Sequence, residues 1–345
     1  MIFEKQSKTG IQSFRKRIKF FNFYTGSMVI DKKMKIFVAG HRGMVGSAIC
    51  RKLIADGFEQ IITATSKNLD LRNQAAVEAF FELHKPVVVI DAAAKVGGIM
   101  ANNTYPYQFL MDNMLIQNNL IQAAVKGEVS KFIFLGSSCI YPRLAPQPLK
   151  EEYLLTGPLE PTNEWYAVAK ITGVKMCDAI RKQFGRDFVS LMPTNLYGPF
   201  DNFDLNTSHV LPAMIRKFHD AKMNGNATVT LWGSGKPLRE FLHVDDLAEA
   251  VSYALNNILP EHLYNVGTGI DLPIYDLALL IQKTVGHTGE VIWDSTKPDG
   301  TPRKLMDISK MHDLGWLHKI SLEEGIKHTY KWFTDNITNY KEVTI

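Results

Sequence analysis

Three side chains near the middle of the chain have the types and spacing for acid–base chemistry on a carbonyl group. Tyr166 and Lys170 stand four residues apart in "YAVAK", so a helix would place them on one face. Ser137 follows the apolar run "KFIFL" (131–135). A phenol has a pKa of about 10, and a neighbouring ammonium lowers it. Together the three groups could hold a carbonyl oxygen and give it a proton while hydride reaches the carbon.

Two further side chains could move protons at neutral pH. Cys139 lies in "GSSCIYP", two residues beyond Ser137, and His209 lies in "NTSHV". Thiols and imidazoles have pKa values of about 8.5 and 6.5, on either side of neutrality. Thr207 or Ser208 is expected to cap a helix, which would put His209 in the first turn, where the dipole disfavours imidazolium. From the residues alone, a packing role for the thiol and a structural role for the histidine stay open.

The other two cysteines, Cys50 and Cys177, lie on apolar faces of predicted helices and are interpreted as packing residues. The three cysteines form no CxxC pair and no cluster with histidines at metal-ligand spacing. The sequence therefore predicts neither disulfides nor a metal site, and it favours a reducing, cytoplasmic location.

A glycine-rich turn indicates a nucleotide site. In "GHRGMVG", Gly40, Gly43 and Gly46 join the apolar run "KIFVAG" (35–40) to a helical pattern over 44–57. Glycines at such a turn allow the backbone to approach a pyrophosphate at a helix N-terminus.

The charges near this turn favour NADP over NAD. An NAD site usually has a carboxylate at the end of the second strand. Here the predicted second strand (60–65) is followed by Lys67, with no acid before Asp70, and Arg42 lies inside the glycine turn. Cations suit a 2′-phosphate. A merely solvated Lys67 is the open alternative.

The elements that must position these residues alternate between apolar strands and helices from 35 to 198. This pattern predicts an α/β fold with a doubly wound parallel sheet, the Rossmann arrangement. After about residue 198 the alternation weakens and loops rich in Asn, Gly and Pro follow. We therefore expect a cofactor domain over 34–198 that the chain rejoins at about 242–268. The segments 199–241 and 269–345 would form a smaller substrate domain.

Composition excludes several classes of protein. The 345 residues are 46% hydrophobic, and the net charge is only +4, which does not indicate a nucleic-acid binder. No apolar run approaches the roughly 18–20 residues of a membrane-spanning helix. Residues 1–33 are strongly basic and are expected to be a disordered leader outside the fold, with a targeting arm as the alternative.

The order of glycine turn, strand-end serine and Y-x-x-x-K resembles the extended short-chain dehydrogenases/reductases, which act largely on nucleotide sugars. Within them the chain resembles enzymes that epimerise carbons 3 and 5 of GDP-4-keto-6-deoxy-D-mannose and then reduce carbon 4 with NADPH. Eight stretches carry this resemblance: "AGHRGMVGSAI", "AAAKVGGIMANNTYP", "FLGSSCIYP", "LEPTNEWYAVAKI", "MPTNLYGPFDNF", "WGSGKPLREFLHVDD", "NVGTG" and "KPDGTPRKLMD". They run from about residue 35 to the C-terminal region and leave the leader out.

The resemblance implies a role for each matching residue. Ser137, Tyr166 and Lys170 would polarise the ketone, and Cys139 with His209 would be the acid–base pair of the epimerisation. The segment 92–98 would pass beneath the nicotinamide ribose. NADP(H) would contact Gly40, His41, Arg42, Gly43, Met44, Val45, Gly46, Lys67, Asp70, Leu135, Gly136, Ser138, Lys170, Pro193, Thr194, Asn195, Leu196 and His209. The GDP-sugar would contact Lys217, Trp232, Arg239 and Asp299.

The resemblance also implies a homodimer formed through sheet-flanking helices, although packing on the sheet would explain their apolar stripes equally well. A 4-epimerase or 4,6-dehydratase on the same fold is an alternative. Dehydratases carry an acidic pair where this chain has Cys139-Ile140, which argues against dehydration. A catalytically dead NADP-sensing protein would be expected to lack Tyr166 or Lys170, and both are present.

Overall fold

The computed structural model describes residues 31–297 and 299–337. The largest sheet in this part of the chain has six parallel strands in the order β2-β1-β3-β4-β5-β9. They are β1 (Lys35–Ala39), β2 (Gln60–Ile62), β3 (Val88–Asp91), β4 (Lys131–Leu135), β5 (Asp187–Pro193) and β9 (Leu263–Val266). The chain moves outward from β1 to β2 and then returns to the other side of β1 with β3. Ligands bind at such a switch point, beyond the carboxyl ends of the strands.

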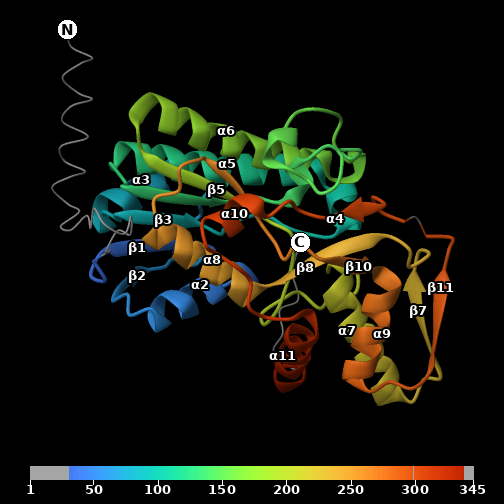
Figure 1. Cartoon of the computed structure of the whole chain (residues 1–345). Coiled ribbons are helices and arrows are strands. Elements are labelled where there is room, and N and C mark those ends of the chain that lie inside the picture. The colour runs from blue at the N-terminus through green and yellow to red at the C-terminus, as the bar shows by residue number, and fades with distance from the viewer. Residues whose placement is uncertain (1–30, 298, 338–345) are drawn as a thin grey trace, which may run out of the picture.

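Helices cover both faces of this sheet (Figure 1). One face carries α3 (Gln74–His84), α5 (Pro106–Lys126) and α6 (Glu164–Phe184), and the other carries α2 (Met44–Ala55) and α8 (Val244–Asn256). Because neighbouring strand residues point to opposite faces, Phe37 is buried under the first group of helices and Ile36 under the second. The predicted doubly wound α/β sheet is confirmed.

The remaining elements form a smaller assembly at one end of the sheet (Figure 1). Its sheets pair β6 (Asn195–Tyr197), β10 (Asp271–Pro273) and β12 (Arg303–Lys304) with β8 (Leu238–His243), and β7 (Thr228–Trp232) with β11 (Glu290–Asp294). A separate hydrophobic core joins them to α7 (Val210–Asn224), α9 (Ile274–Val285) and α11 (Leu322–Asp335). Two short helices, α4 (Ile99–Thr104) and α10 (Ser309–Asp313), complete the described helices.

The chain crosses between the two parts more than once. After β8, helix α8 packs against α2 of the large sheet, and β9 then pairs in parallel with β5. The buried carboxylate of Glu240 in β8 accepts hydrogen bonds from the backbone N–H groups of Thr268, Gly269 and Met306. This carboxylate therefore ties β8 to the segments that follow β9 and β12.

Two predicted strands are shorter than expected. The strand predicted over 60–65 ends at Ile62, which leaves Thr65 and Lys67 in a turn. The apolar run after 187 breaks into β5 and β6 at Thr194, whose N–H donates to the Val266 carbonyl oxygen of β9 while its hydroxyl donates to the Glu240 carbonyl oxygen. Most of the predicted leader, residues 1–30, lies outside the described residues.

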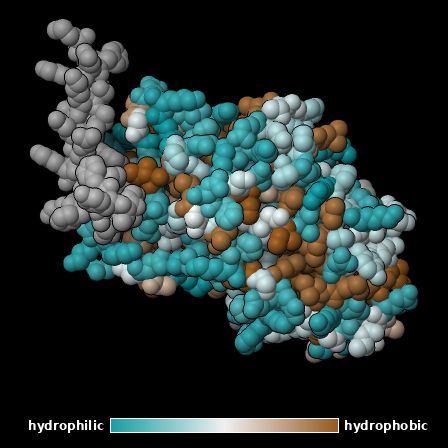
Figure 2. All heavy atoms as spheres, in the orientation of Figure 1, coloured by the Kyte–Doolittle hydropathy of each residue, from teal (hydrophilic) through white to brown (hydrophobic). Residues whose placement is uncertain are grey.

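The surface seen in Figure 2 is mainly hydrophilic over the large sheet, and hydrophobic residues gather toward the smaller assembly. Among the residues that the structure describes, no helix is both long enough and apolar enough to span a bilayer.

Candidate active site

A cavity of about 910 Å³ opens at the carboxyl ends of β1, β3, β4 and β5. Every residue predicted to contact the cofactor lines it except Gly46. Four of the five predicted catalytic residues line it as well, namely Ser137, Tyr166, Lys170 and His209. Residues 92–97 of the predicted segment 92–98 form part of the wall, and Gly98 does not.

Two positions of the glycine turn have no room for a side chain. Gly40 has φ +78°, and a Cβ there would lie 2.6 Å from the Ala92 carbonyl oxygen. A Cβ on Gly46 would lie 2.2 Å from the Gly40 carbonyl oxygen. Gly46 therefore allows α2 to pack closely on β1, and it is a packing residue rather than part of the cavity wall.

At the outer end of the cavity, Arg42 and Lys67 are exposed to solvent and line the wall. Asp70 is already paired: Arg72 donates to its two carboxylate oxygens, from Nε at 3.0 Å and from Nη2 at 2.9 Å. This ion pair holds the pKa of Asp70 below its ordinary value. The carboxylate is thus neutralised by a cation that the sequence analysis did not identify.

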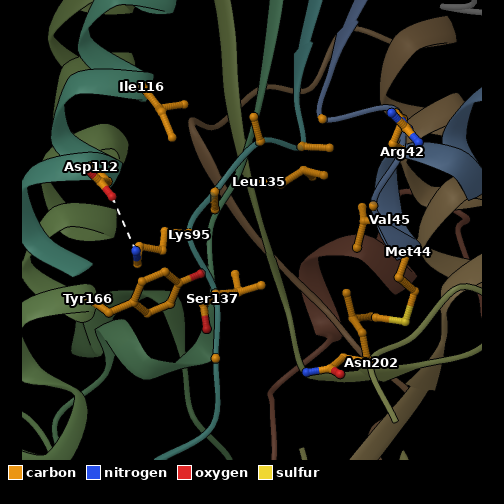
Figure 3. A pocket seen from close by; sticks show the side chains of 18 of the residues that line it. Arg42, Met44, Val45, Lys95, Asp112, Ile116, Leu135, Ser137, Tyr166 and Asn202 are labelled. Carbon is orange, nitrogen blue, oxygen red and sulfur yellow. Dashed lines mark ion pairs between the residues drawn. The ribbon is translucent and has the colours of Figure 1, made fainter. Parts of the chain in front are cut away.

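Ser137 and Tyr166 point toward one another inside the cavity (Figure 3). Ser137 ends the strand-to-turn segment after β4 and caps a 3₁₀ turn over Ser138–Ile140, accepting a hydrogen bond from the Cys139 N–H at 3.5 Å. Tyr166 lies in the first turn of α6, where its ring meets Phe109 of α5 edge to face. Beside them, the Lys95 ammonium pairs with Asp112 at 3.5 Å.

Lys170 lies on the same helix face as Tyr166, but its Nζ donates to the Leu135 carbonyl oxygen at 2.9 Å. Its ammonium is 5.8 Å from the centre of the Tyr166 ring. Burial raises the pKa of Tyr166, and the charges of Cys139 and Asp91 add to the effect. The raised pKa of Tyr166 is contrary to the lowering that the sequence predicts, because burial acts on the phenol and the Lys170 ammonium is bonded to the Leu135 carbonyl oxygen.

Asp91 is a second acid that the sequence analysis did not identify. It ends β3, is 1% exposed, and accepts a hydrogen bond from the Ala93 N–H at 3.2 Å with Oδ1, while Oδ2 has no partner. Burial raises its pKa to about 6 against the opposing charge of Lys170. The sequence signal for a buried acid here is the aspartate at the end of the apolar run "PVVVID".

Cys139 lies behind the cavity wall, next to Ser138, and is only 5% exposed. Burial raises the pKa of its thiol, whereas the ammonium groups of Lys304 and Lys170 and the Ser137 hydroxyl act in the opposite direction. Burial also raises the pKa of Cys50 to about 11 and that of Cys177 to about 12. All three cysteines are unpaired.

His209 is the N-cap of α7, not a residue of its first turn, and its imidazole makes no capping hydrogen bond. The predicted capping role of Thr207 or Ser208 is therefore wrong. The imidazole faces the cavity, where surrounding protein and the positive charge of Lys304 lower its pKa. The neutral imidazole is favoured, as predicted, but for a different physical reason.

The predicted GDP-sugar residues lie outside this cavity, on the smaller assembly. The Lys217 ammonium lies 5.6 Å from the Trp232 ring centre and donates to the Thr230 carbonyl oxygen. Lys297 lies 5.5 Å from the same ring. The Trp232 side chain is 56% exposed, so it offers an open aromatic face between two cations.

Arg239 and Lys304 are register partners on the parallel strands β8 and β12. The charges of Asp299 and Glu160 act on Arg239, and Asp299 accepts hydrogen bonds from the Ser234 N–H and hydroxyl at 2.9 and 2.6 Å. Lys304 therefore lies opposite the predicted cation Arg239, and its charge acts on both members of the predicted acid–base pair, Cys139 and His209. It lies in the matched stretch "KPDGTPRKLMD", but its place on a strand beside Arg239 could not be known from spacing.

No three His, Cys, Asp or Glu side chains in the described ranges are grouped as metal ligands.

A parallel sheet with a glycine turn at its switch point and a Ser-Tyr-Lys set beside it defines a nucleotide-dependent enzyme that works on a carbonyl. The chain belongs to the NAD dependent epimerase/dehydratase family, whose model matches residues 36–267.

Comparison with similar proteins narrows the class of enzyme within this family. It is 56% identical over 318 residues to the putative GDP-L-fucose synthase 2 of Arabidopsis thaliana, covering 92% of this chain and 97% of the relative. It is 52% identical over 319 residues to the GDP-L-fucose synthase of Escherichia coli K12, covering 90% and 99%. A solved GDP-mannoheptose C4 reductase from Campylobacter jejuni with NADP bound is 40% identical, with a TM-score of 0.81, covering 88% of this chain and 99% of that one.

Proposed function

We propose that the protein converts GDP-4-keto-6-deoxy-D-mannose to GDP-L-fucose by epimerising carbons 3 and 5 and then reducing carbon 4 with NADPH. The observation that carries this proposal is that the His209 imidazole lines the same cavity as Ser137 and Tyr166, while the Cys139 thiol lies directly behind its wall, next to Ser138. Relatives named GDP-L-fucose synthase cover nearly the whole chain at 52–56% identity.

The cavity fits NADPH, which supplies hydride to the ketone when bound. Gly40 leaves a cradle that a Cβ would fill, and Arg42 and Lys67 offer two cations at the exposed end for a 2′-phosphate. Asp70 does not oppose that phosphate, since Arg72 neutralises it. Residues 92–97 line the far end, next to Tyr166.

In the reduction, the Ser137 and Tyr166 hydroxyls hold the ketone oxygen. Burial keeps the Tyr166 phenol protonated, so it can donate its proton as negative charge develops on that oxygen. The Lys170 ammonium, 5.8 Å from the centre of the Tyr166 ring, would stabilise the phenolate that remains once the proton has left.

In the epimerisation, the same two hydroxyls stabilise the enolate that forms when a proton leaves the carbon next to the ketone. Inversion needs an acceptor on one face of the ring and a donor on the other. In the resting site burial keeps the Cys139 thiol protonated, and His209 is held neutral. We therefore infer that His209 first takes a proton while Cys139 gives one.

The cations outside the cavity are positioned for the rest of the substrate. We infer that Arg239 and Lys217 bind the diphosphate, because guanidinium and ammonium groups are the usual partners of phosphate. Trp232 offers its exposed face to the guanine base.

The proposal is tested with purified protein, GDP-4-keto-6-deoxy-D-mannose and NADPH. Absorbance at 340 nm should fall, and the product should co-elute with GDP-L-fucose. A second candidate, a C4 reductase without epimerase activity, is favoured by the likeness to the Campylobacter jejuni reductase. That enzyme would also oxidise NADPH but would give an unepimerised 6-deoxyhexose, so the identity of the product separates the two.

We also propose that the protein is a homodimer in the cytoplasm. The outer faces of α5 and α6 leave Leu115, Trp165 and Val168 37–47% exposed, which suits a four-helix interface between two copies. The three unpaired cysteines fit a reducing compartment. Sedimentation at several concentrations tests the dimer, and Trp165→Glu should yield monomers.

A further inference from the structure

The position of His209 is set by the backbone that precedes it. Its imidazole makes no capping hydrogen bond at the start of α7. The preceding residues are tightly held: Asp204 Oδ1 accepts hydrogen bonds from the Thr207 N–H and hydroxyl, each at 2.9 Å. The Ser208 N–H donates to the Asp204 carbonyl oxygen at 3.0 Å. Any displacement of residues 204–208 would therefore move His209.

This segment rests on a turn from a different part of the cavity wall. The Gly98 N–H donates to the Thr207 carbonyl oxygen at 3.1 Å. The approach is close, since a Cβ on Gly98 would lie 3.0 Å from the Ser208 carbonyl oxygen. Gly98 directly follows the 92–97 wall, so the two walls of the cavity meet at this contact.

One buried side chain fixes the turn. Asn102 of α4 donates from Nδ2 to the carbonyl oxygens of Gly97 at 2.7 Å and Gly98 at 3.1 Å. It is 7% exposed, and its amide donates to both carbonyl groups of the turn. The Gly98 carbonyl oxygen also accepts from the Asn102 backbone N–H at 3.1 Å. Removing the amide would therefore take away the hydrogen bond that it gives to the Gly97 carbonyl and free the turn to shift.

A different asparagine anchors the middle of the 92–98 segment. Asn113 of α5 accepts from the Lys95 N–H at 2.9 Å and donates to the Lys95 carbonyl oxygen at 3.0 Å. The wall beside Tyr166, where Lys95 lies, therefore keeps its own anchor when Asn102 is changed (Figure 3). This separation makes the two ends of the segment experimentally distinguishable.

We propose that Asn102 is a positioning residue for the epimerisation: it fixes the Gly97–Gly98 turn on which the backbone carrying His209 rests. The inference depends on the proposed function, because it uses the assignment of His209 as a proton-transfer group of the epimerisation. Loss of Asn102 should then slow proton transfer at carbons 3 and 5 more than hydride transfer at carbon 4.

The test measures the two steps separately. Solvent deuterium uptake into the 4-keto sugar with NADP⁺ present reports epimerisation, and oxidation of GDP-L-fucose by NADP⁺ at 340 nm reports hydride transfer. For Asn102→Ala we expect deuterium uptake to fall roughly tenfold to a hundredfold, as a displacement of about 1 Å in a catalytic group can cost. Hydride transfer should stay within about threefold of the wild type.

Asn257→Ala is the matched control, because Asn257 makes the same kind of amide-to-carbonyl bond, to Tyr253 four residues earlier, away from the site. It should leave both steps unchanged. If Asn102→Ala does not fold, Gly98→Ala tests the same contact from the other side and should give the same imbalance. Equal losses in both steps, or unchanged deuterium uptake, would overturn the inference. A wild-type protein that forms no GDP-L-fucose would instead reject the proposed function.

Discussion

Lys304 of β12 lies where its charge acts on both Cys139 and His209, the two groups that we assign to the epimerisation. A positive charge between a thiol and an imidazole lowers the pKa of both groups. It favours a thiolate at Cys139 and a neutral ring at His209. Burial raises the pKa of Cys139 whereas Lys304 lowers it, so the two influences on the thiol oppose one another. Burial and Lys304 both lower the pKa of His209.

Cys139→Ser should slow solvent deuterium exchange into the 4-keto sugar by roughly 10²–10⁴-fold, the usual contribution of a general acid–base group. A serine hydroxyl fits the space of the thiol, but its pKa is far too high for it to act as a general acid or base near neutral pH. Mass spectrometry of the sugar after timed incubation measures the effect. Cys177→Ser, a buried cysteine of α6, is the control and should exchange normally. Full exchange in Cys139→Ser would assign this proton-transfer role to another group.

Tyr166→Phe should lose reduction by a similar factor, because it removes the proton donor to the ketone oxygen. Its ring would keep the edge-to-face contact with Phe109, so the cavity should retain its shape. Binding of NADPH, followed by its fluorescence, is expected to stay within a few-fold of the wild type. A variant that still reduces at the wild-type rate would refute the role of the phenol.

Arg42→Ala should raise KM for NADPH by roughly tenfold to a hundredfold, the value of a hydrogen bond to a charged group. KM for NADH should change little, because NADH lacks the 2′-phosphate. Lys67→Ala tests the second exposed cation at the same end of the cavity. Equal changes for both cofactors in Arg42→Ala would remove this guanidinium from 2′-phosphate recognition.

The buried carboxyl group of Asp201 should make the stability of the fold depend on pH. It lines the cavity, is 6% exposed, and its Oδ2 has no hydrogen-bond partner. Burial raises its pKa to about 7, so folding favours the protonated acid. Its contribution to stability is full below about pH 4, the ordinary pKa of an aspartate, and is lost as pH rises through 7.

Asp201→Asn removes this loss while keeping an oxygen that can accept the Asn202 N–H. Its free energy of unfolding in urea should exceed that of the wild type by a few kcal/mol at pH 8, with little difference at pH 4.5, given about 1.4 kcal/mol per pKa unit. Asp294→Asn should show no gain at pH 8, because hydrogen bonds from Thr296 lower the pKa of Asp294. A variant no more stable than the wild type at pH 8 would contradict the account of Asp201.

The sequence could predict the sheet and its order of elements because buried parallel strands are continuous apolar runs. It could also place the glycine turn, Ser137, Tyr166 and Lys170, which are local patterns tied to strand ends and helix starts. It could not place the charge of Lys304 within reach of Cys139, because strand β12 is only two residues long and pairs Arg303 with Leu238, which lies far earlier in the chain.

The burial of side chains is the second property that residue spacing in the sequence does not predict. The Y-x-x-x-K pattern puts Lys170 on the correct face of α6, yet only the packed structure shows its Nζ bonded to the Leu135 carbonyl oxygen. Asp91 closes an apolar strand, where its side chain could have been exposed at the end of the sheet or buried beneath α6. The N-cap of α7 is His209 and not Thr207 or Ser208, because the Thr207 hydroxyl donates to Asp204 instead of capping the helix.

The most direct test of the whole account is NMR of the product formed from GDP-4-keto-6-deoxy-D-mannose and NADPH in deuterated water. The account predicts GDP-L-fucose with deuterium at carbons 3 and 5 of the sugar and protium from NADPH at carbon 4. A product reduced at carbon 4 but carrying no deuterium at carbons 3 and 5 would contradict it, because Cys139 and His209 would then have moved no proton.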